Sequence, residues 1–325
     1  MKAKTGALII TLAVLAHVGS SRDGAALQPG LPEGMTREQM KAKMAADPAL
    51  FLRVMRKAMK WDEPAEPVKV AGPIYFVGTK GLASWLIHGS EGDVLLNTCM
   101  ENSGPLIEAS IRKLGFDPKA VKWLLAGHSH VDHVGGHAYI KKLTGAQVAA
   151  AAQEAGLLES GGKGQFNYDG VPGFDWEPVK VDRVLRDGDE VKLGDLALTA
   201  HVTPGHTTGS VTWTMQILDG GRALGVVFPD GAGANPGYRI VKNPSYPGIE
   251  GDYRDTLHFL ARLKPDIFLG AHTSMGGLDQ KLARAATEGT RAFVDPEGYR
   301  RFVAAAAADL EATIDAEMGV APKSN

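Results

Sequence analysis

Residues 126–136 read AGHSHVDHVGG and bring four metal-binding side chains into six consecutive positions. The four are His128, His130, Asp132 and His133. Their spacing, i, i+2, i+4 and i+5, matches neither one face of a helix nor one face of a strand. Burying three imidazoles and a carboxylate without a metal or a partner group would be costly. This stretch therefore predicts a metal site built on a loop.

The sequence on both sides of this loop alternates between strand and helix patterns. Before the loop we expect strands at IYFVG, SWLIHG and DVLLNTC, a helix at GPLIEASIRKLGF and a strand at VKWLLAG. After it we expect a helix at HAYIKKLTG and a strand at QVAAA, with more strands between residues 189 and 230, a helix at YRDTLHFLARLKP, a strand at DIFLGAH and a last helix from Pro296. This order indicates an α/β core. The loop lies at the carboxyl end of its strand, where α/β proteins place their sites.

Two isolated histidines can complete the metal site. Catalytic zinc sites usually have three protein ligands and one open position, so two such sites need six ligands, and the loop supplies four. His206 lies in a turn, TPGHTTGS, and His272 follows the strand that begins at Asp266. A lone histidine at a strand end is usually only a hydrogen-bonded loop residue, so neither is decisive alone. His88, His137, His201 and His258 have no such context and are interpreted as structural or solvated.

Composition limits the classes of function. The 325 residues carry a formal net charge of −2 and contain no run rich in lysine or arginine, which disfavours a nucleic-acid partner. Cys99 is the single cysteine, so the chain can form neither an internal disulfide nor a cysteine-rich zinc site. Any metal must therefore be held by histidine and carboxylate side chains.

Residues 1–26 have the three-part layout of a signal peptide. Lys2 and Lys4 precede an apolar run from Ala7 to Val18, which is followed by small residues. The run is shorter than the roughly 20 residues that a spanning helix needs. We expect cleavage between residues 19 and 26, and a mature bacterial protein that is periplasmic or secreted and has no membrane association.

Residues 27–66 are predicted to be an N-terminal helical extension, and residues 67–325 a single domain. Two short helices are expected between residues 35 and 60, the first with a capping box from Thr36 to Gln39 and the second with Asp47 as its N-cap. Their apolar stripe packs on the domain or forms a mobile cover over an active site. Residues 159–176 lack periodicity and are predicted to be a long surface loop.

The motifs HSHVDH, TPGHTTG and GAH, in this order, resemble the metal-ligand motifs of the metallo-β-lactamase superfamily. The HxHxDH form, without a cysteine ligand in the third motif, resembles subclass B3 metallo-β-lactamases, and the similarity extends over roughly residues 68–285. It implies an αββα sandwich, in which helices flank two mixed β-sheets, with two Zn2+ ions at one edge. His128, His130 and His206 would hold the first ion, and Asp132, His133 and His272 the second.

The resemblance also implies an activity that confers antibiotic resistance. The expected reaction is hydrolysis of the β-lactam amide bond of penicillins, cephalosporins and carbapenems by a zinc-bound hydroxide, with Asp132 as the catalytic residue that orients the nucleophile. The substrate is a small molecule, and no covalent acyl-enzyme is expected, since neither Ser210 nor Ser274 stands in a G-x-S-x-G or S-x-x-K serine-enzyme motif. The flavodiiron branch would have a carboxylate at His130, so redox chemistry is disfavoured. The oligomeric state is not predicted.

Two departures from the B3 pattern keep other functions open. The segment FPDGAGANPGY lacks the serine that many B3 enzymes carry after the aspartate, so Thr207, Asn235 or backbone N–H groups are expected to bind the substrate carboxylate. Asp230 stands near the position of the metal-bridging aspartate of glyoxalase II, and Asn97 where many members have aspartate. The alternatives are a hydrolase of this fold acting on a lactone or thioester, and a non-catalytic exported zinc-binding protein.

Overall fold

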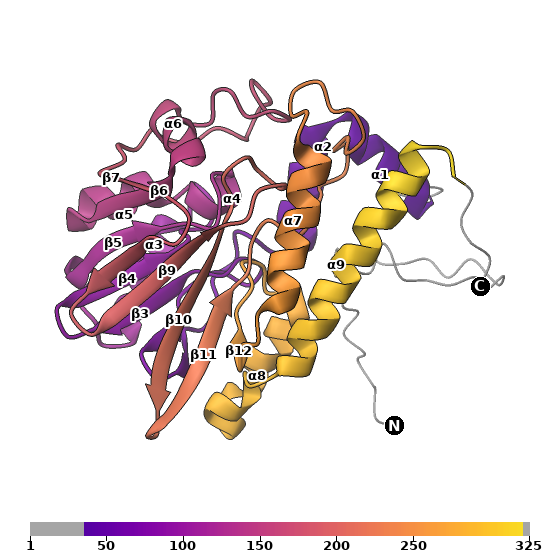
Figure 1. Ribbon diagram of the computed structural model, residues 1–325. Helices are drawn as coiled ribbons and strands as arrows, with labels where there is room; N and C mark the ends of the chain where they lie inside the picture. Colours follow the sequence, from indigo (N-terminus) through magenta and orange to yellow (C-terminus); the bar gives the residue numbers. More distant parts are fainter. Residues whose placement is uncertain (1–35, 321–325) are drawn as a thin grey trace, which may run out of the picture.

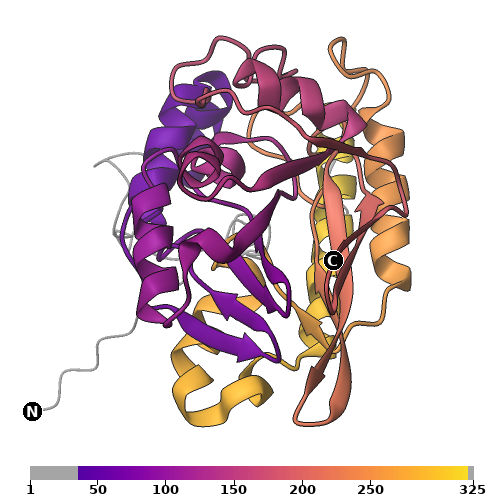
Figure 2. The same ribbon diagram turned by 90° about the vertical axis from the view of Figure 1, so that its left-hand side faces the viewer.

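The computed structural model describes residues 36–320. The predicted signal peptide, residues 1–26, lies outside the described residues, as do residues 27–35 of the predicted extension. Two β-sheets pack face to face, and helices cover the outer face of each sheet (Figures 1 and 2). This is the αββα sandwich with two mixed sheets that the resemblance implied.

The first sheet has seven strands in sequence order, antiparallel from β1 to β4 and parallel from β4 to β7. They are β1 (Val68–Ala71), β2 (Ile74–Phe76), β3 (Trp85–Gly89), β4 (Gly92–Leu96), β5 (Val121–Leu125), β6 (Gln147–Ala151) and β7 (Arg183–Leu185). The second sheet has the order β12-β11-β10-β9-β8, with β11 and β12 parallel and the other pairs antiparallel. Its strands are β8 (Glu190–Leu193), β9 (Leu196–Val202), β10 (Val211–Asp219), β11 (Arg222–Phe228) and β12 (Ile267–Phe268).

The helices fall into two outer layers. In Figure 2 the indigo and purple helices lie on one side of the two sheets, and the orange and yellow helices α7 and α9 on the other. The α-helices are α1 (Arg37–Ala46), α2 (Pro48–Ala58), α3 (Gly104–Lys113), α4 (Val131–Val134), α5 (His137–Thr144), α6 (Ala152–Ser160), α7 (Ile249–Arg262), α8 (Leu278–Glu288) and α9 (Pro296–Glu317). Within residues 36–320, none of the helices combines the length and the apolar character needed to cross a membrane.

The space between the sheets is filled by apolar side chains from alternate positions of the strands. Trp85 of the first sheet and Phe228 of the second face each other with ring centroids 6.1 Å apart. Trp85 and Trp213 are almost completely buried. Large aromatic side chains dominate core energetics because each removes much apolar surface from water, so these contacts fix the two sheets relative to each other.

The two predicted N-terminal helices are present, with the predicted caps. Thr36 and Gln39 form the capping box of α1, and Asp47 Oδ1 accepts a hydrogen bond from the backbone N–H of Leu50 at 2.9 Å. Phe51 and Met55 of α2 are buried in the hydrophobic cluster that also contains residues of the main body. The apolar stripe thus packs on the domain, as one of the two interpretations expected.

The prediction of a surface loop at residues 159–176 needs a correction. The segment consists of the end of α6 and a series of turns, but its aromatic side chains Tyr168, Phe174 and Trp176 are buried. Tyr168 stacks on Phe174 with ring centroids 4.0 Å apart. Aromatic rings that pack on one another need no helical or strand periodicity, which is why the sequence pattern gave no sign of their burial.

Candidate metal centre

Four loops converge at one edge of the sandwich. They follow β5, β9, β11 and β12, so both sheets contribute, and each loop leaves the carboxyl end of its strand. In order they carry the HSHVDH stretch, His206, Asp230 and His272. Carboxyl ends of strands are the usual place for sites in α/β proteins, and here they gather all six predicted ligands.

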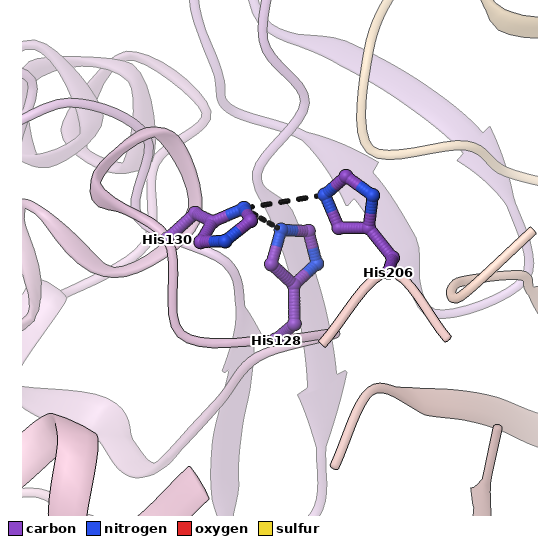
Figure 3. A group of neighbouring side chains, drawn as sticks. All are labelled: His128, His130 and His206. Atoms are coloured by element: carbon purple, nitrogen blue, oxygen red, sulfur yellow. Dashed lines mark hydrogen bonds between the residues drawn. The ribbon is translucent and has the colours of Figure 1, made fainter. Parts of the chain in front are cut away.

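The first group of ligands, the first tripod, consists of His128, His130 and His206. His128 Nε2 lies 3.0 Å from His130 Nδ1, and His206 Nε2 lies 3.2 Å from the same atom. Figure 3 shows the three rings pointing ring nitrogens toward one another, two from one loop and one from another. Tetrahedral zinc with Zn–N bonds of about 2.0–2.1 Å separates its nitrogen ligands by about 3.4 Å. The observed spacing suits such a metal.

The second group of ligands, the second tripod, consists of Asp132, His133 and His272. Asp132 Oδ2 lies 3.4 Å from His272 Nε2 and 3.7 Å from His133 Nε2. These separations also match the edges of a tetrahedral site. Each tripod offers three protein ligands and leaves a fourth position free, which is the arrangement of catalytic zinc sites.

The backbone explains how one short stretch serves both tripods. His130 is extended, with φ −108° and ψ 157°, and acts as the N-cap of α4, whose single turn holds Asp132 and His133. The extended part directs His128 and His130 to one side, and the turn directs the next two ligands elsewhere. The irregular spacing in the sequence therefore marks the change from extended chain to helix.

The residues present fit zinc. Burial lowers the pKa values of His128 and His130 well below their ordinary value, so both rings are neutral, which is the form that binds a metal. Several imidazole nitrogens face one another without enough protons to pair them all. A cation is the group that would satisfy these nitrogen atoms together.

Asp230 lies between the two tripods. Both of its carboxylate oxygens lie 3.0 Å from Nδ1 of His128. One carboxylate oxygen of Asp230, one ring nitrogen of His128 and one ring nitrogen of His133 all lie within 4.8 Å of one another. A Cβ on Gly127 would come within 1.9 Å of Asp230 Oδ2, so only glycine allows this approach. Burial raises the pKa of Asp230, while the nearby His133 opposes the rise.

Other polar groups hold the ligand loops in place. His206 Nδ1 donates to the carbonyl oxygen of Gly233 at 2.6 Å, and the Tyr238 hydroxyl donates to the carbonyl oxygen of His206 at 3.0 Å. Asn97 Oδ1 accepts the backbone N–H of Gly127 at 3.1 Å, so asparagine serves at this position as an acceptor. Asn97 also has a positive φ of 63°, which asparagine tolerates better than most residues.

The two residues expected to bind substrate have different surroundings. Thr207 is buried, and its hydroxyl lies 2.9 Å from the Ser210 hydroxyl. Asn235 is half-buried and donates one amide N–H to the Tyr168 hydroxyl at 2.9 Å. The ring of Tyr168 in turn lies 5.2 Å from the ring of His130.

Sequence reasoning missed several residues at the site. Tyr168, Tyr238, Trp61 and Glu154 contact the ligands or their loops. For Tyr238 the PGY stretch was a usable signal, whereas the others are single residues in unremarkable segments. None of the metal-binding groups found in residues 36–320 includes His88, His137, His201 or His258.

Comparison with known proteins decides the family. Residues 80–272 match the profile of the metallo-beta-lactamase superfamily. The chain belongs to this superfamily. The match begins just before β3 and ends at His272, so it contains both tripods.

Solved structures of superfamily members are similar over almost their whole length. The FEZ-1 metallo-β-lactamase from Legionella gormanii is 39% identical with a TM-score of 0.77, and the alignment covers 79% of this chain and 98% of that one. The class B3 di-zinc metallo-β-lactamase LRA-12 from an Alaskan soil metagenome is 32% identical with a TM-score of 0.74, over 78% of this chain and 96% of that one. The predicted membership and fold are thereby confirmed.

Curated superfamily relatives carry other names. A hydroxyacylglutathione hydrolase from Methylobacterium sp. (strain 4-46) is 34% identical over 124 residues, which are 38% of this chain and 41% of that protein. The chain therefore spans about two fifths of that relative. The superfamily membership and the two tripods support a metallo-hydrolase.

Proposed function

We propose that this protein hydrolyses the β-lactam amide bond of penicillins, cephalosporins and carbapenems with two bound Zn2+ ions. The observation that carries the proposal is the pair of adjacent tripods. They lie in a fold whose alignment with the FEZ-1 metallo-β-lactamase covers 98% of that chain. The likeness to a class B3 di-zinc metallo-β-lactamase supports the number of metals. His128, His130 and His206 would hold the first ion, and Asp132, His133 and His272 the second.

The chain's own residues have distinct tasks in this reaction. When bound, zinc lowers the pKa of a coordinated water toward about 7 and polarises a carbonyl oxygen. Asp132 uses Oδ2 in the second tripod, which leaves its other carboxylate oxygen to accept a hydrogen bond from the attacking water and to orient it. Asp230 accepts from Nδ1 of His128 and so keeps the lone pair of Nε2 directed into the first tripod.

Substrate recognition is assigned to the loop that follows β11. Asn235 uses one amide N–H for the Tyr168 hydroxyl, so its second N–H is available for the carboxylate of a lactam. Thr207 would first have to leave Ser210, so of the two expected residues Asn235 is better placed. Ser210 itself is fully buried, which supports a reaction without a serine nucleophile.

A panel of hydrolysis assays tests the proposal. Purified protein with two zinc equivalents, measured by elemental analysis, is assayed against a penicillin, a cephalosporin and a carbapenem. We expect ring opening that a chelator abolishes and added zinc restores. Absence of ring opening with all three substrates while two zincs are bound would refute a β-lactamase.

Asp230 supports a second candidate, hydrolysis of a thioester or lactone. One of its carboxylate oxygens lies within 4.8 Å of a ring nitrogen of one ligand from each tripod, His128 and His133. Curated relatives also include hydroxyacylglutathione hydrolases. Turnover of S-lactoylglutathione, an acyl-homoserine lactone and nitrocefin by one preparation separates the candidates, because the preferred substrate will exceed the others in kcat/KM. Zinc binding without any metal-dependent hydrolysis would instead indicate a non-catalytic zinc-binding protein.

We also propose that the mature protein is periplasmic or secreted, and that residues 67–325 belong to one catalytic domain, preceded by the extension 27–66, of which the described residues 36–66 pack on the domain. The burial of Phe51 and Met55 in a shared cluster supports the second point. N-terminal sequencing of the exported protein tests the first. A mature N-terminus between residues 20 and 27 is expected, and an intact Met1 in the exported fraction would contradict it.

A further inference from the structure

Glu154 of α6 is a buried acidic side chain to which the proposed reaction gives no task. It is 2% exposed, and no lysine or arginine in the described part of the chain forms an ion pair with it. A buried carboxylate is retained only where other groups compensate for its lost hydration. Its partners therefore indicate what it does.

Both carboxylate oxygens of Glu154 accept backbone hydrogen bonds, and each comes from a different ligand loop. Oε2 accepts from the N–H of Ser129 at 2.6 Å, and Oε1 accepts from the N–H of Gly209 at 3.1 Å. Ser129 stands between His128 and His130, whereas Gly209 follows His206 by three residues. One carboxylate thus joins the two chain segments that supply the first tripod.

The two segments belong to different sheets, so their separation is not set by strand pairing at the ligands themselves. The first follows β5 of the seven-stranded sheet, and the second connects β9 to β10 of the other sheet. Near the strands, the N–H of Val211 donates to the carbonyl oxygen of Gly127 at 2.6 Å. Glu154 provides a further connection, next to the ligands.

The packing at Gly209 shows that its loop is seated directly on α6. A Cβ at this position would lie 2.8 Å from Gln153 Cβ and 2.9 Å from Glu154 Cγ. The hydrogen bond from Gly209 to Glu154 therefore accompanies a close contact of backbone with helix. A loop fixed by both contacts has little freedom to move relative to α6.

We propose that Glu154 is the positioning residue of the first tripod, and that its bridging carboxylate sets the separation between the His128–His130 segment and His206. The second tripod has no ligand on the loop of Gly209, so loss of the bridge should affect the first site more than the second. This inference rests on the metal-dependent function proposed above, but it concerns metal binding and not the identity of the substrate.

The test compares Glu154→Gln and Glu154→Ala with Glu159→Gln. Glu159 lies on the same helix and accepts the backbone N–H of Val181 at 3.1 Å, without contact to either ligand loop, so it is a matched control. Each variant is placed in two backgrounds, His272→Ala to leave the first site and His206→Ala to leave the second. Zinc affinity is measured by competition with a chromophoric chelator, and the visible spectrum of the cobalt-substituted protein reports ligand geometry.

We expect Glu154→Ala to weaken zinc binding about 10- to 100-fold in the His272→Ala background and to shift the cobalt spectrum. Substitution of residues that orient metal ligands commonly costs this much affinity. Glu154→Gln keeps one acceptor oxygen but turns an NH2 group toward a backbone donor, so its effect should be intermediate. In the His206→Ala background both variants should bind zinc with much less change in affinity. In both backgrounds Glu159→Gln should bind zinc with the affinity of the parent variant.

Three results would overturn the proposal. They are unchanged zinc affinity of Glu154→Gln at the first site, equal weakening at both sites, and an equal effect of Glu159→Gln. If Glu154→Ala does not fold, Glu154→Gln decides alone. A wild-type protein that binds two zincs but opens no lactam ring would refute the β-lactamase proposal and leave this test intact.

Discussion

The carboxylate of Asp230 lies 3.0 Å from Nδ1 of His128 and accepts a hydrogen bond from it, so the opposite nitrogen of that ring, Nε2, carries the lone pair that faces His130. Such carboxylate–histidine contacts fix the tautomer and the orientation of metal-binding imidazoles. A carboxylate oxygen of Asp230 also lies within 4.8 Å of a ring nitrogen of His133 in the second tripod, so Asp230 is placed either to orient a ligand or to bind metal itself. The two roles predict different consequences of substitution.

We expect Asp230→Asn to retain two zinc equivalents, because the amide oxygen can still accept from Nδ1 of His128. Asp230→Ala removes the acceptor and should weaken zinc binding at the first site about 10- to 100-fold. Elemental analysis and chelator competition measure both quantities. Loss of a full zinc equivalent in Asp230→Asn would show instead that the carboxylate is a metal ligand, and would favour the thioester or lactone candidate.

The sequence was sufficient to predict that the six proposed ligands lie close together, because their positions support one another. Four ligands in six residues cannot share one face of a helix or strand, and His206 and His272 became credible only as the partners that complete two tripods. The caps of α1 and α2 were predictable for a similar reason, since a capping box is a local pattern. In each case the information lies within a few neighbouring residues.

The residues that support the ligands could not be predicted in this way. Glu154 is one glutamate in a short helix, and its partners Ser129 and Gly209 are 25 and 55 residues distant in sequence. Tyr168 and Trp61 likewise meet their ligands only through tertiary packing. Contacts between distant segments leave no periodic or local signature in a single sequence.

Replacement of His272 tests the second tripod directly. His272→Ala removes one of three ligands and places an apolar group against Asp132, so we expect loss of one of two zinc equivalents and a fall in kcat/KM of more than about 100-fold. His258→Ala, on the exposed side of α7, is the control and should retain both metals and full activity. Unchanged zinc content in His272→Ala would contradict the two-zinc arrangement.

Removal of metal should also reduce stability, because the convergent histidines are satisfied only by a cation. A ligand at 100 times its dissociation constant stabilises the folded state by about 2.7 kcal/mol. We therefore expect a chelator to lower the Tm of the wild type and zinc to restore it. The double variant His206→Ala/His272→Ala should show a much smaller difference, and an equal chelator effect in both proteins would argue against these sites.

Trp61 links the N-terminal helices to the metal centre. It is almost fully buried, and its ring centroid lies 5.4 Å from that of His272. Trp61→Ala should destabilise the zinc-free protein by about 3–5 kcal/mol and weaken zinc binding at the second tripod. Trp61→Phe keeps an aromatic ring against His272 and should preserve most of the metal affinity. Denaturant unfolding and zinc titration of both variants measure this, and normal zinc binding by folded Trp61→Ala would show that the contact serves stability alone.

Gly127 provides the sharpest test of how closely Asp230 must approach the HSHVDH loop. A Cβ at this position would lie 1.9 Å from Asp230 Oδ2, so Gly127→Ala must displace the carboxylate and with it the hydrogen bond to His128. We expect overpacking to cost about 1–3 kcal/mol and zinc binding to fall at the first tripod while the second is less affected. Gly156→Ala is the matched control: no atom lies within 4 Å of its added Cβ, and alanine within α6 should stabilise the protein by up to about 1 kcal/mol. Thermal unfolding and zinc titration of the two variants decide the matter, because a first site of wild-type affinity in Gly127→Ala would mean that the Asp230–His128 contact does not control metal binding.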